Sequence, residues 1–313
     1  MTPIFAIHVG FSKTGTTTLQ NHLFRNHSQV EYLGKPYCDP SLKAELHRLM
    51  MLDSIAYQAE VDGLSLREIV NSRFATMGKD KRVLLLSDEM FVSYTKVRDK
   101  GVIAQRIQDV LAPQKIIITI RNQKELLKSA YLSRGRLLFN VPPRFYGLHV
   151  TFEQWLSLGY DNFARGYLEH ADFAKTIAYY ARVYGRENVC VLLLEELIHK
   201  KAAHLQKLAD FLGIDAAEAL TRVQDAHEHQ EISQAILDWE ALNTRFFPVN
   251  TWFPVRAALT LITTVRKKIK KDAQAYVTIT ASWEKRLRDI YRAGNQQLVH
   301  EYGLPLEQYD YPL

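Results

Sequence analysis

The stretch that decides the fold of this chain is Gly10-Phe11-Ser12-Lys13-Thr14-Gly15-Thr16-Thr17-Thr18-Leu19. The apolar run from Ile4 to Gly10 that leads into it is short, bulky and ended by glycine, which predicts a buried strand. Helical spacing of the apolar residues after it predicts a helix from about Thr16 to Arg25. A glycine-bounded turn between a strand and a helix points free backbone N–H groups and the positive end of the helix dipole at one place. The sequence therefore predicts a phosphate-binding loop at residues 10–18, called the phosphate loop below.

The position of its lysine separates this loop from a Walker A loop. In a Walker A loop, a lysine follows the second glycine and the next hydroxyl holds magnesium. Here Thr16 follows Gly15, and Lys13 lies two residues before that glycine. The cation therefore lies within the loop, from where it can reach the bridging oxygen on the 5′ side of a nucleotide, and the hydroxyls of Thr16, Thr17 and Thr18 add donors. A P-loop kinase or NTPase is disfavoured on this ground and stays the alternative function.

Further short apolar runs predict a parallel sheet. Runs at 83–86, 116–120 and 189–194 each precede a helical pattern, and continuous apolar strands of this kind imply a sheet covered on both faces. Helices are expected at about 41–57, 66–76, 102–111, 123–133, 173–184 and 204–212, then at 232–244, 254–271 and 282–302. We therefore predict an α/β fold, a doubly wound parallel sheet flanked by helices on both faces. We expect one domain over 1–313, with an α/β core at about 1–215 and a helical C-terminal part at about 216–313.

A second phosphate contact is predicted where the run 116–120 ends. Arg121 ends this strand, and Ser129 follows eight residues later on the next predicted helix. A strand-end arginine reaches over the carboxyl edge of the sheet, where open α/β folds bind ligands, and its forked guanidinium suits bidentate phosphate recognition. Ser129 lies about two turns into the helix and can face the same crevice.

Both segments, in this order and on these elements, resemble motifs of the PAPS-dependent sulfotransferase family, in which PAPS is 3′-phosphoadenosine 5′-phosphosulfate. The run Ser12-Lys13-Thr14-Gly15-Thr16-Thr17 resembles the family's 5′-phosphosulfate loop, and Arg121-Asn122-Gln123-Lys124-Glu125 with Ser129 resembles its 3′-phosphate motif. The resemblance implies a P-loop-like sulfotransferase fold and an enzyme that moves a sulfuryl group from PAPS to a hydroxyl or amine. It implies that residues 12–18 bind the phosphosulfate end of the co-substrate, and that Arg121 and Ser129 hold its 3′-phosphate.

The chain departs from the family's pattern at two places. Cytosolic members commonly carry an aromatic residue near the adenine at the end of the later strand, where this chain has Leu194. The family's glycine-rich Trp-Lys loop near the C-terminus is missing. The sequence does not decide which residues replace this loop at the 3′-phosphate. The available basic residues are Arg134, Arg136, Lys267, Lys268, Lys270 and Lys271.

Sulfuryl transfer needs a base for the acceptor's proton and cations where negative charge develops, and it needs no metal. By analogy with phosphoryl transfer, Lys13 would stabilise charge on the departing oxygen. For the base we expect Glu89, because it follows the strand before the one that Arg121 ends. Asp88 is the reserve candidate, and Glu31 is offered because some family members use a glutamate soon after the loop. The non-catalytic alternative for Glu89 is a carboxylate that caps the following segment or pairs with Lys13 or Arg121.

Composition restricts the class of protein. A formal charge of +6 over 313 residues, with 47% hydrophobic residues, suits a globular protein with an anionic ligand but is too small for a nucleic-acid-binding surface. The start shows no signal peptide and no run is long and apolar enough for a membrane span, so a cytoplasmic location is expected. The basic run 266–271 leaves peripheral membrane contact open. Cys38 and Cys190 predict no disulfide framework.

The acceptor cannot be deduced from these patterns. A saccharide or another small molecule fits, and the fold does not determine the second pocket. His227 and His229 alternate in a polar stretch without further Cys or His nearby, so no metal site is predicted. A silent binding protein on the same fold, which would bind the adenosine bisphosphate product and transfer nothing, is the third hypothesis. The oligomeric state is not predicted.

Overall fold

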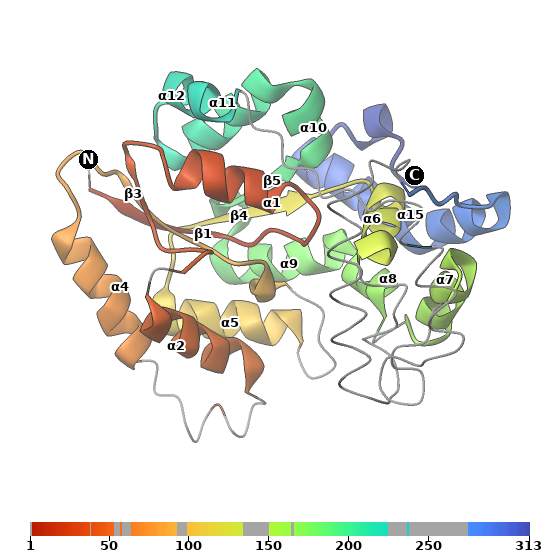
Figure 1. The fold of residues 1–313 in the computed structure, drawn as a ribbon, viewed down its shortest axis with the longest axis horizontal. Coiled ribbons are helices and arrows are strands. Elements are labelled where there is room, and N and C mark those ends of the chain that lie inside the picture. Colours follow the sequence, from red (N-terminus) through yellow and green to blue (C-terminus); the bar gives the residue numbers. More distant parts are fainter. Residues whose placement is uncertain are drawn as a thin grey trace.

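A computed structural model describes residues 2–37, 39–52, 57, 64–92, 99–133, 150–163, 166–224, 237 and 275–313. They contain a five-stranded sheet in the order β2-β3-β1-β4-β5, in which every neighbouring pair is parallel (Figure 1). The strands are β1 (Ile4–His8), β2 (Val30–Tyr32), β3 (Val83–Ser87), β4 (Lys115–Ile120) and β5 (Val189–Leu193). The predicted parallel α/β architecture is confirmed.

Alternate residues of the strands face two separate cores. On one face, side chains such as Ile7, Leu86 and Ile118 join the larger core, and on the other Ala6, Leu85 and Ile117 join the smaller one. Because a strand's side chains alternate between faces, an apolar run without polar interruptions is what a doubly covered sheet requires. The apolar strand pattern of the sequence thus has a direct structural cause.

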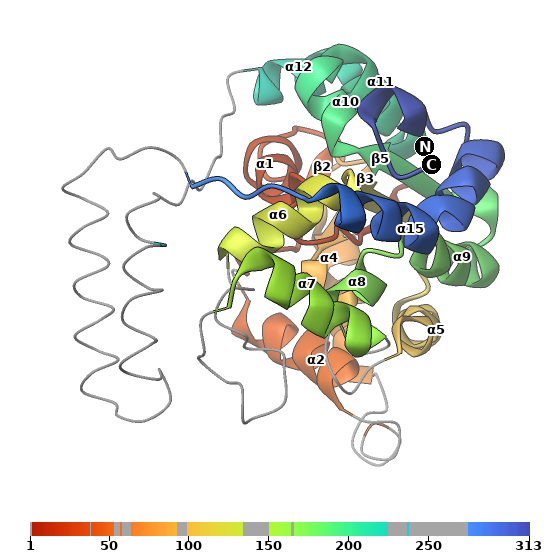
Figure 2. The same ribbon diagram turned by 90° about the vertical axis from the view of Figure 1, so that its right-hand side faces the viewer.

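Helices cover both faces (Figures 1 and 2). The larger core takes α2 (Pro40–Met51), α4 (Leu64–Thr76), α5 (Lys100–Leu111) and α9 (Phe173–Tyr184). The smaller core takes α1 (Thr16–Thr18) with its π-helical continuation η1 (Leu19–Phe24), α10 (Leu194–His199), α11 (Lys201–Leu212) and α12 (Ala216–Val223).

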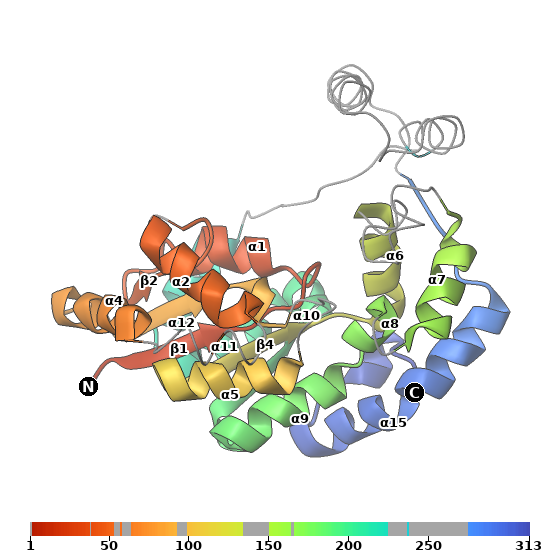
Figure 3. The ribbon, with the colours of Figure 1, turned by 90° about the horizontal axis from the view of Figure 1, so that it is seen from below.

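Four helices lie beyond the carboxyl end of β4 (Figure 3). They are α6 (Gln123–Ser133), α7 (Phe152–Asp161), α8 (Tyr167–His170) and α15 (Ala281–Tyr302). Trp283, Leu287 and Tyr291 of α15 belong to the larger core, and the Tyr291 hydroxyl donates to the Leu168 carbonyl at 2.9 Å. The last helix is therefore packed on the α/β part, and the count of one domain stays a prediction.

The boundaries differ from the prediction where patterns are short. β2 was not predicted because it has three residues, of which only Val30 is buried. The first strand ends at His8 rather than Gly10, although Val9 N–H and Phe11 N–H still donate to β4 carbonyls at 2.7 and 3.3 Å. Helices α7, α8, α10 and α12 were also not predicted. The helix expected at 254–271 lies outside the described residues, as does the one expected at 232–244 apart from Leu237.

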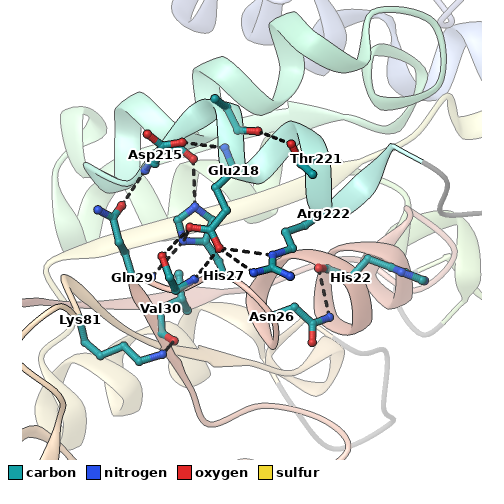
Figure 4. Close-up of polar contacts among 12 residues, drawn as sticks. His22, Asn26, His27, Gln29, Val30, Lys81, Asp215, Glu218, Thr221 and Arg222 are labelled. Atoms are coloured by element: carbon teal, nitrogen blue, oxygen red, sulfur yellow. Dashed lines mark hydrogen bonds and ion pairs between the residues drawn. The ribbon is translucent and has the colours of Figure 1, made fainter.

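A polar cluster fixes α12 to the amino-terminal side of β2 (Figure 4). Glu218 of α12 accepts hydrogen bonds from the Ser28 N–H at 2.8 Å and the Ser28 hydroxyl at 2.5 Å, and pairs with Arg222 at 3.1 Å. The buried His27 ring lies 2.9 Å from the Asp215 carbonyl. We call Ser28, His27, Glu218 and Arg222 the Glu218 cluster.

No helix among the described residues is long and apolar enough to cross a membrane. Cys190 is buried in β5, where burial raises the pKa of its thiol to about 11.

Candidate active site

The phosphate loop is bound to the neighbouring strand by its own hydroxyls. The Thr14 hydroxyl donates to the Phe11 carbonyl at 2.5 Å and lies 2.8 Å from the Thr119 hydroxyl of β4. Thr14 is completely buried. The Thr14 hydroxyl is therefore engaged in contacts that hold the loop in place. Thr14 can contribute to a phosphate site through its backbone N–H.

Close packing within the loop requires glycine at two positions. A Cβ on Gly10 would lie 2.1 Å from a Thr16 methyl carbon and 2.7 Å from the Thr119 hydroxyl oxygen. Gly15 has a φ of +81°, and a Cβ there would lie 2.7 Å from the Leu194 side chain. The loop therefore folds tightly around its backbone, as a phosphate cradle must. Leu194, where the family commonly has an aromatic residue, packs against this loop.

Lys13 has a left-handed backbone, which is rare for a residue with a side chain. Its φ is +69°, and this conformation costs an ordinary residue about 1 kcal/mol. Such strain persists only where the surrounding contacts determine the conformation. One of these contacts comes from Arg121, whose guanidinium donates to the Lys13 carbonyl at 3.3 Å. The structure thus brings the Arg121 guanidinium against the backbone of the predicted phosphate loop.

The turn after Arg121 is fixed by a neighbouring strand end and by the C-terminal segment. Asn122 N–H donates to the Glu195 carboxylate at 2.8 Å, and the Asn122 amide donates to the carbonyls of Tyr309 and Asp310 at 2.7 and 2.8 Å. Glu195 also accepts from the Tyr311 hydroxyl at 3.0 Å. These bonds hold the backbone from which Arg121 projects.

Ser129 lies on α6, six residues into the helix and about 9 Å along its axis. It is partly buried. No hydrogen bond between Ser129 and Arg121 occurs within the part of the chain that the structure describes. Its role at a 3′-phosphate stays a prediction.

Glu89 accepts hydrogen bonds from two neighbouring elements. Its Oε1 accepts from the Thr16 hydroxyl of the phosphate loop at 2.8 Å and from the Gln20 amide at 3.4 Å. Its Oε2 lies 3.1 Å from the Lys35 ammonium. The predicted base is therefore in direct contact with the phosphate loop, and it forms an ion pair with Lys35, a partner that the sequence did not indicate.

Charges around Glu89 keep it ionised. Burial raises the pKa of its carboxyl, but the Lys35 charge and the Thr16 hydroxyl outweigh this and hold the pKa below its usual value. Burial likewise lowers the pKa of Lys35, but Asp88 and Glu89 raise it above its ordinary value. At neutral pH the pair is a carboxylate and an ammonium, so Glu89 can accept a proton.

The rival carboxylates are less suited to meet an acceptor. Asp88 caps the short helix η2 (Glu89–Phe91) by accepting from Met90 N–H at 2.8 Å, and also binds Lys35 and the Tyr37 hydroxyl. Its side chain is 3% exposed, against 18% for Glu89. Glu31 pairs with Leu84 in the sheet, three residues before β3 ends. It therefore lies about 10 Å short of the carboxyl edge.

A buried network behind Glu89 was not predicted from the sequence. Gln20 donates to the Ser87 hydroxyl at 3.0 Å, and Ser87 lies 2.8 Å from a ring nitrogen of His8. Burial lowers the pKa of His8 to about 4, so the ring is neutral at pH 7. Gln20 lies in the π-helical turn, where Arg25 N–H bonds the Gln20 carbonyl five residues back. Such turns are frequent at functional sites, but apolar spacing alone does not reveal them.

The remaining predicted residues have different exposures. Thr17 is exposed, while Ser12, Lys13 and Thr18 are partly buried. The substitutes for the missing C-terminal loop, Arg134, Arg136, Lys267, Lys268, Lys270 and Lys271, lie outside the described residues, as do His227 and His229. Among the residues that are described, no group of three or more His, Cys, Asp or Glu is arranged to hold a metal ion.

The chain is similar to several solved structures at low sequence identity. A sulfotransferase from Alicyclobacillus acidocaldarius is 19% identical, with 84% of this chain and 96% of that chain covered and a TM-score of 0.46. The sulfotransferase domain of the Synechococcus PCC 7002 olefin synthase is 17% identical, with 85% and 94% covered and a TM-score of 0.42. A mouse sulfotransferase complexed with PAP is 14% identical, with 94% and 88% covered and a TM-score of 0.41. No curated protein matches the sequence at a significant level.

The family comparison covers most of the chain. The family described as "Sulfotransferase domain" matches residues 6–297, which include the phosphate loop, Glu89, Arg121 and Ser129. A match to a sulfotransferase family over this much of the chain indicates that the protein is a transferase. The chain therefore belongs to the sulfotransferase family.

Proposed function

We propose that this protein transfers the sulfuryl group of PAPS to a hydroxyl or amine of a small acceptor. The observation that carries the proposal is the contact between the Arg121 guanidinium and the Lys13 carbonyl at 3.3 Å. It puts a cation suited to one phosphate beside a loop suited to another, at the edge of the sheet where open α/β folds bind ligands. PAPS carries phosphates at both the 3′ and the 5′ position of one adenosine, and the mouse relative was solved with PAP.

The residues of the site fit this co-substrate. The tight glycines and the left-handed Lys13 leave the loop backbone folded around one point, which suits a 5′-phosphate. Arg121, on the fixed turn after β4, supplies the charge for a 3′-phosphate. Ser129 on α6 would add a hydroxyl to the same phosphate.

Glu89 and Lys13 would share the chemistry. Glu89 takes the proton of the acceptor as the acceptor's oxygen or nitrogen bonds to sulfur, and the bond between sulfur and the bridging phosphate oxygen breaks. Lys13 stabilises the negative charge that this oxygen gains. Thr16 and Lys35 hold the Glu89 carboxylate in place through 2.8 and 3.1 Å contacts. The leaving product is PAP.

A P-loop kinase is the alternative, and metal dependence separates the two. The test is transfer of ³⁵S from labelled PAPS to pools of saccharides, phenols, amines and small alcohols, with and without EDTA. We expect label in at least one pool, unaffected by EDTA, and a rate of labelling at least about 100-fold lower with Lys13→Ala. Phosphate transfer from ATP that EDTA abolishes, with no ³⁵S transfer, would establish the kinase instead. PAP binding without transfer to any pool would favour a silent binding protein. The cytoplasmic location stays a prediction.

A further inference from the structure

Tyr167 connects the phosphate loop to a part of the chain more than 150 residues away. It is the first residue of α8, and its hydroxyl lies 3.1 Å from the Ser12 hydroxyl. Ser12 directly precedes the strained Lys13. The contact joins α8 to the point where the loop's backbone is most constrained.

The position of Tyr167 is itself determined by close packing. Gly166 before it approaches α7 so closely that a Cβ there would lie 2.8 Å from the Gly159 carbonyl. The Tyr167 ring packs against Trp155 and His170, with ring centroids 5.7 and 5.0 Å apart. These contacts fix where the hydroxyl points.

The same segment meets the loop at a second place. The His170 ring lies 5.0 Å from the Phe11 ring, and Phe11 also packs edge-on against Phe173 of α9 at 4.8 Å. Phe11 and Ser12, consecutive in the loop, are thus both held from α8 and α9. Lys13 follows and is held from the other side by Arg121.

The hydroxyl of Tyr167 keeps its proton at neutral pH. Burial raises the pKa of Tyr167 above its ordinary value, and the Ser12 hydrogen bond and the charge of Arg121 offset only part of this rise. A neutral phenol can donate to or accept from Ser12, and it adds no charge that would repel a phosphate. Its influence on a ligand would therefore pass through the loop.

We propose that Tyr167 is a positioning residue of the donor site, which fixes Ser12 and thereby holds Lys13 where the leaving phosphate oxygen will lie. This inference rests on the proposed function. Tyr167→Phe keeps the ring and its packing and removes only the hydroxyl. We expect a fall of up to about fivefold in PAP affinity, because the loop must then be held in its binding conformation without a hydrogen bond of typical strength. With PAPS, kcat falls as well, because Lys13 acts on the departing oxygen.

A matched control is Tyr184→Phe, since Tyr184 is a buried tyrosine of α9 whose hydroxyl donates to the Ala104 carbonyl of α5 at 2.9 Å. It should change the melting temperature as much as Tyr167→Phe or more, and leave PAP affinity and kcat unchanged. If Tyr167→Phe also leaves both unchanged, the inference is wrong.

A double-mutant cycle with Ser12→Ala shows whether Tyr167 acts through Ser12. PAP affinity is measured by calorimetry, so no acceptor is needed. We expect the double variant to bind PAP no more weakly than Ser12→Ala alone. If the losses of PAP affinity in the two single variants multiply in the double variant, Tyr167 acts on the nucleotide independently of Ser12, and the inference is wrong. If the wild-type protein itself binds no PAP, the proposed function fails first, and that result is distinct from a Tyr167→Phe variant that binds as the wild type does.

Discussion

Two carboxylate clusters in this protein have nearly the same local chemistry but lie at opposite ends of the sheet. Glu89 accepts from the Thr16 hydroxyl and pairs with Lys35. Glu218 accepts from the Ser28 hydroxyl and pairs with Arg222 (Figure 4). Glu89 follows the carboxyl end of β3, whereas Ser28 lies just before the amino end of β2.

The difference shows that position on the sheet, rather than the set of contacts, decides what a carboxylate can do. The partners of Glu218 come from the residues before β2 and from α12, so the cluster joins segments that border the smaller core. The Thr16 partner of Glu89 belongs to the phosphate loop. We expect the first cluster to support catalysis and the second to support only stability.

The largest effect is expected for Glu89→Gln. The amide keeps the shape and can still accept from Thr16, but it cannot take a proton. Turnover should fall by roughly 10²- to 10⁴-fold, the usual contribution of a general base, while PAP affinity measured by calorimetry stays within about threefold of wild type. Near-normal turnover would show that Glu89 is not the base and would leave Asp88 as the candidate.

Lys13→Ala should have the next largest effect. Loss of a cation at the departing oxygen should lower kcat by about 10²- to 10³-fold. The rate is measured with saturating PAPS, so that weaker binding does not contribute. A variant whose kcat is normal and whose KM alone rises would show that Lys13 binds the ground state without acting in the reaction.

Ser129→Ala should weaken PAP binding by about tenfold, because a hydrogen bond to a charged group contributes roughly 1.5 kcal/mol or more. Ser157→Ala is the matched control, since Ser157 donates to the Glu153 carbonyl within its own helix, α7. Equal affinities of the two variants for PAP would place Ser129 outside the 3′-phosphate site.

Glu218→Gln should give the smallest effect and none on kcat. We expect a loss of about 1 kcal/mol of stability, which lowers the melting temperature by roughly 2 °C in a chain of this size. A fall in kcat comparable to that of Glu89→Gln would show that the Glu218 cluster also supports catalysis, contrary to our expectation.

The effect of Glu218→Gln should depend on pH. Burial opposes ionisation of Glu218, but its hydrogen bonds with Ser28 and its contacts with Arg222 and His27 lower its pKa from 4.5 to about 2. A carboxyl whose pKa is lowered by folding stabilises the protein above its unfolded pKa, and the contribution is lost as pH falls toward the folded pKa. The difference in melting temperature between wild type and variant should therefore be full at pH 6 and shrink between about pH 4.5 and 2.

The sequence predicted the parallel sheet and the phosphate loop because both depend on local pattern. Buried parallel strands need unbroken apolar runs, and β3, β4 and β5 are within a residue of their predicted bounds. The loop depends on Gly10 and Gly15, whose neighbours leave no room for a side chain. By contrast, β2 is too short to show a pattern.

Contacts that join distant parts of the chain could not be predicted in this way. Lys35, the ion-pair partner of Glu89, is 54 residues away from it, and Tyr167 is 155 residues from Ser12. Nothing in the local sequence of either residue indicates its partner. These are the residues that position the predicted groups, and only the fold reveals them.

A comparison of PAP with 5′-AMP tests most directly whether Lys13 and Arg121 hold the 5′- and the 3′-phosphate of one nucleotide. Calorimetry with wild type, Lys13→Ala and Arg121→Ala gives the ratio of the two affinities. We predict that Lys13→Ala weakens both ligands by a similar factor, because both carry the 5′-phosphate, and that Arg121→Ala weakens PAP far more than AMP. A wild-type preference for PAP that survives unchanged in Arg121→Ala would contradict the account.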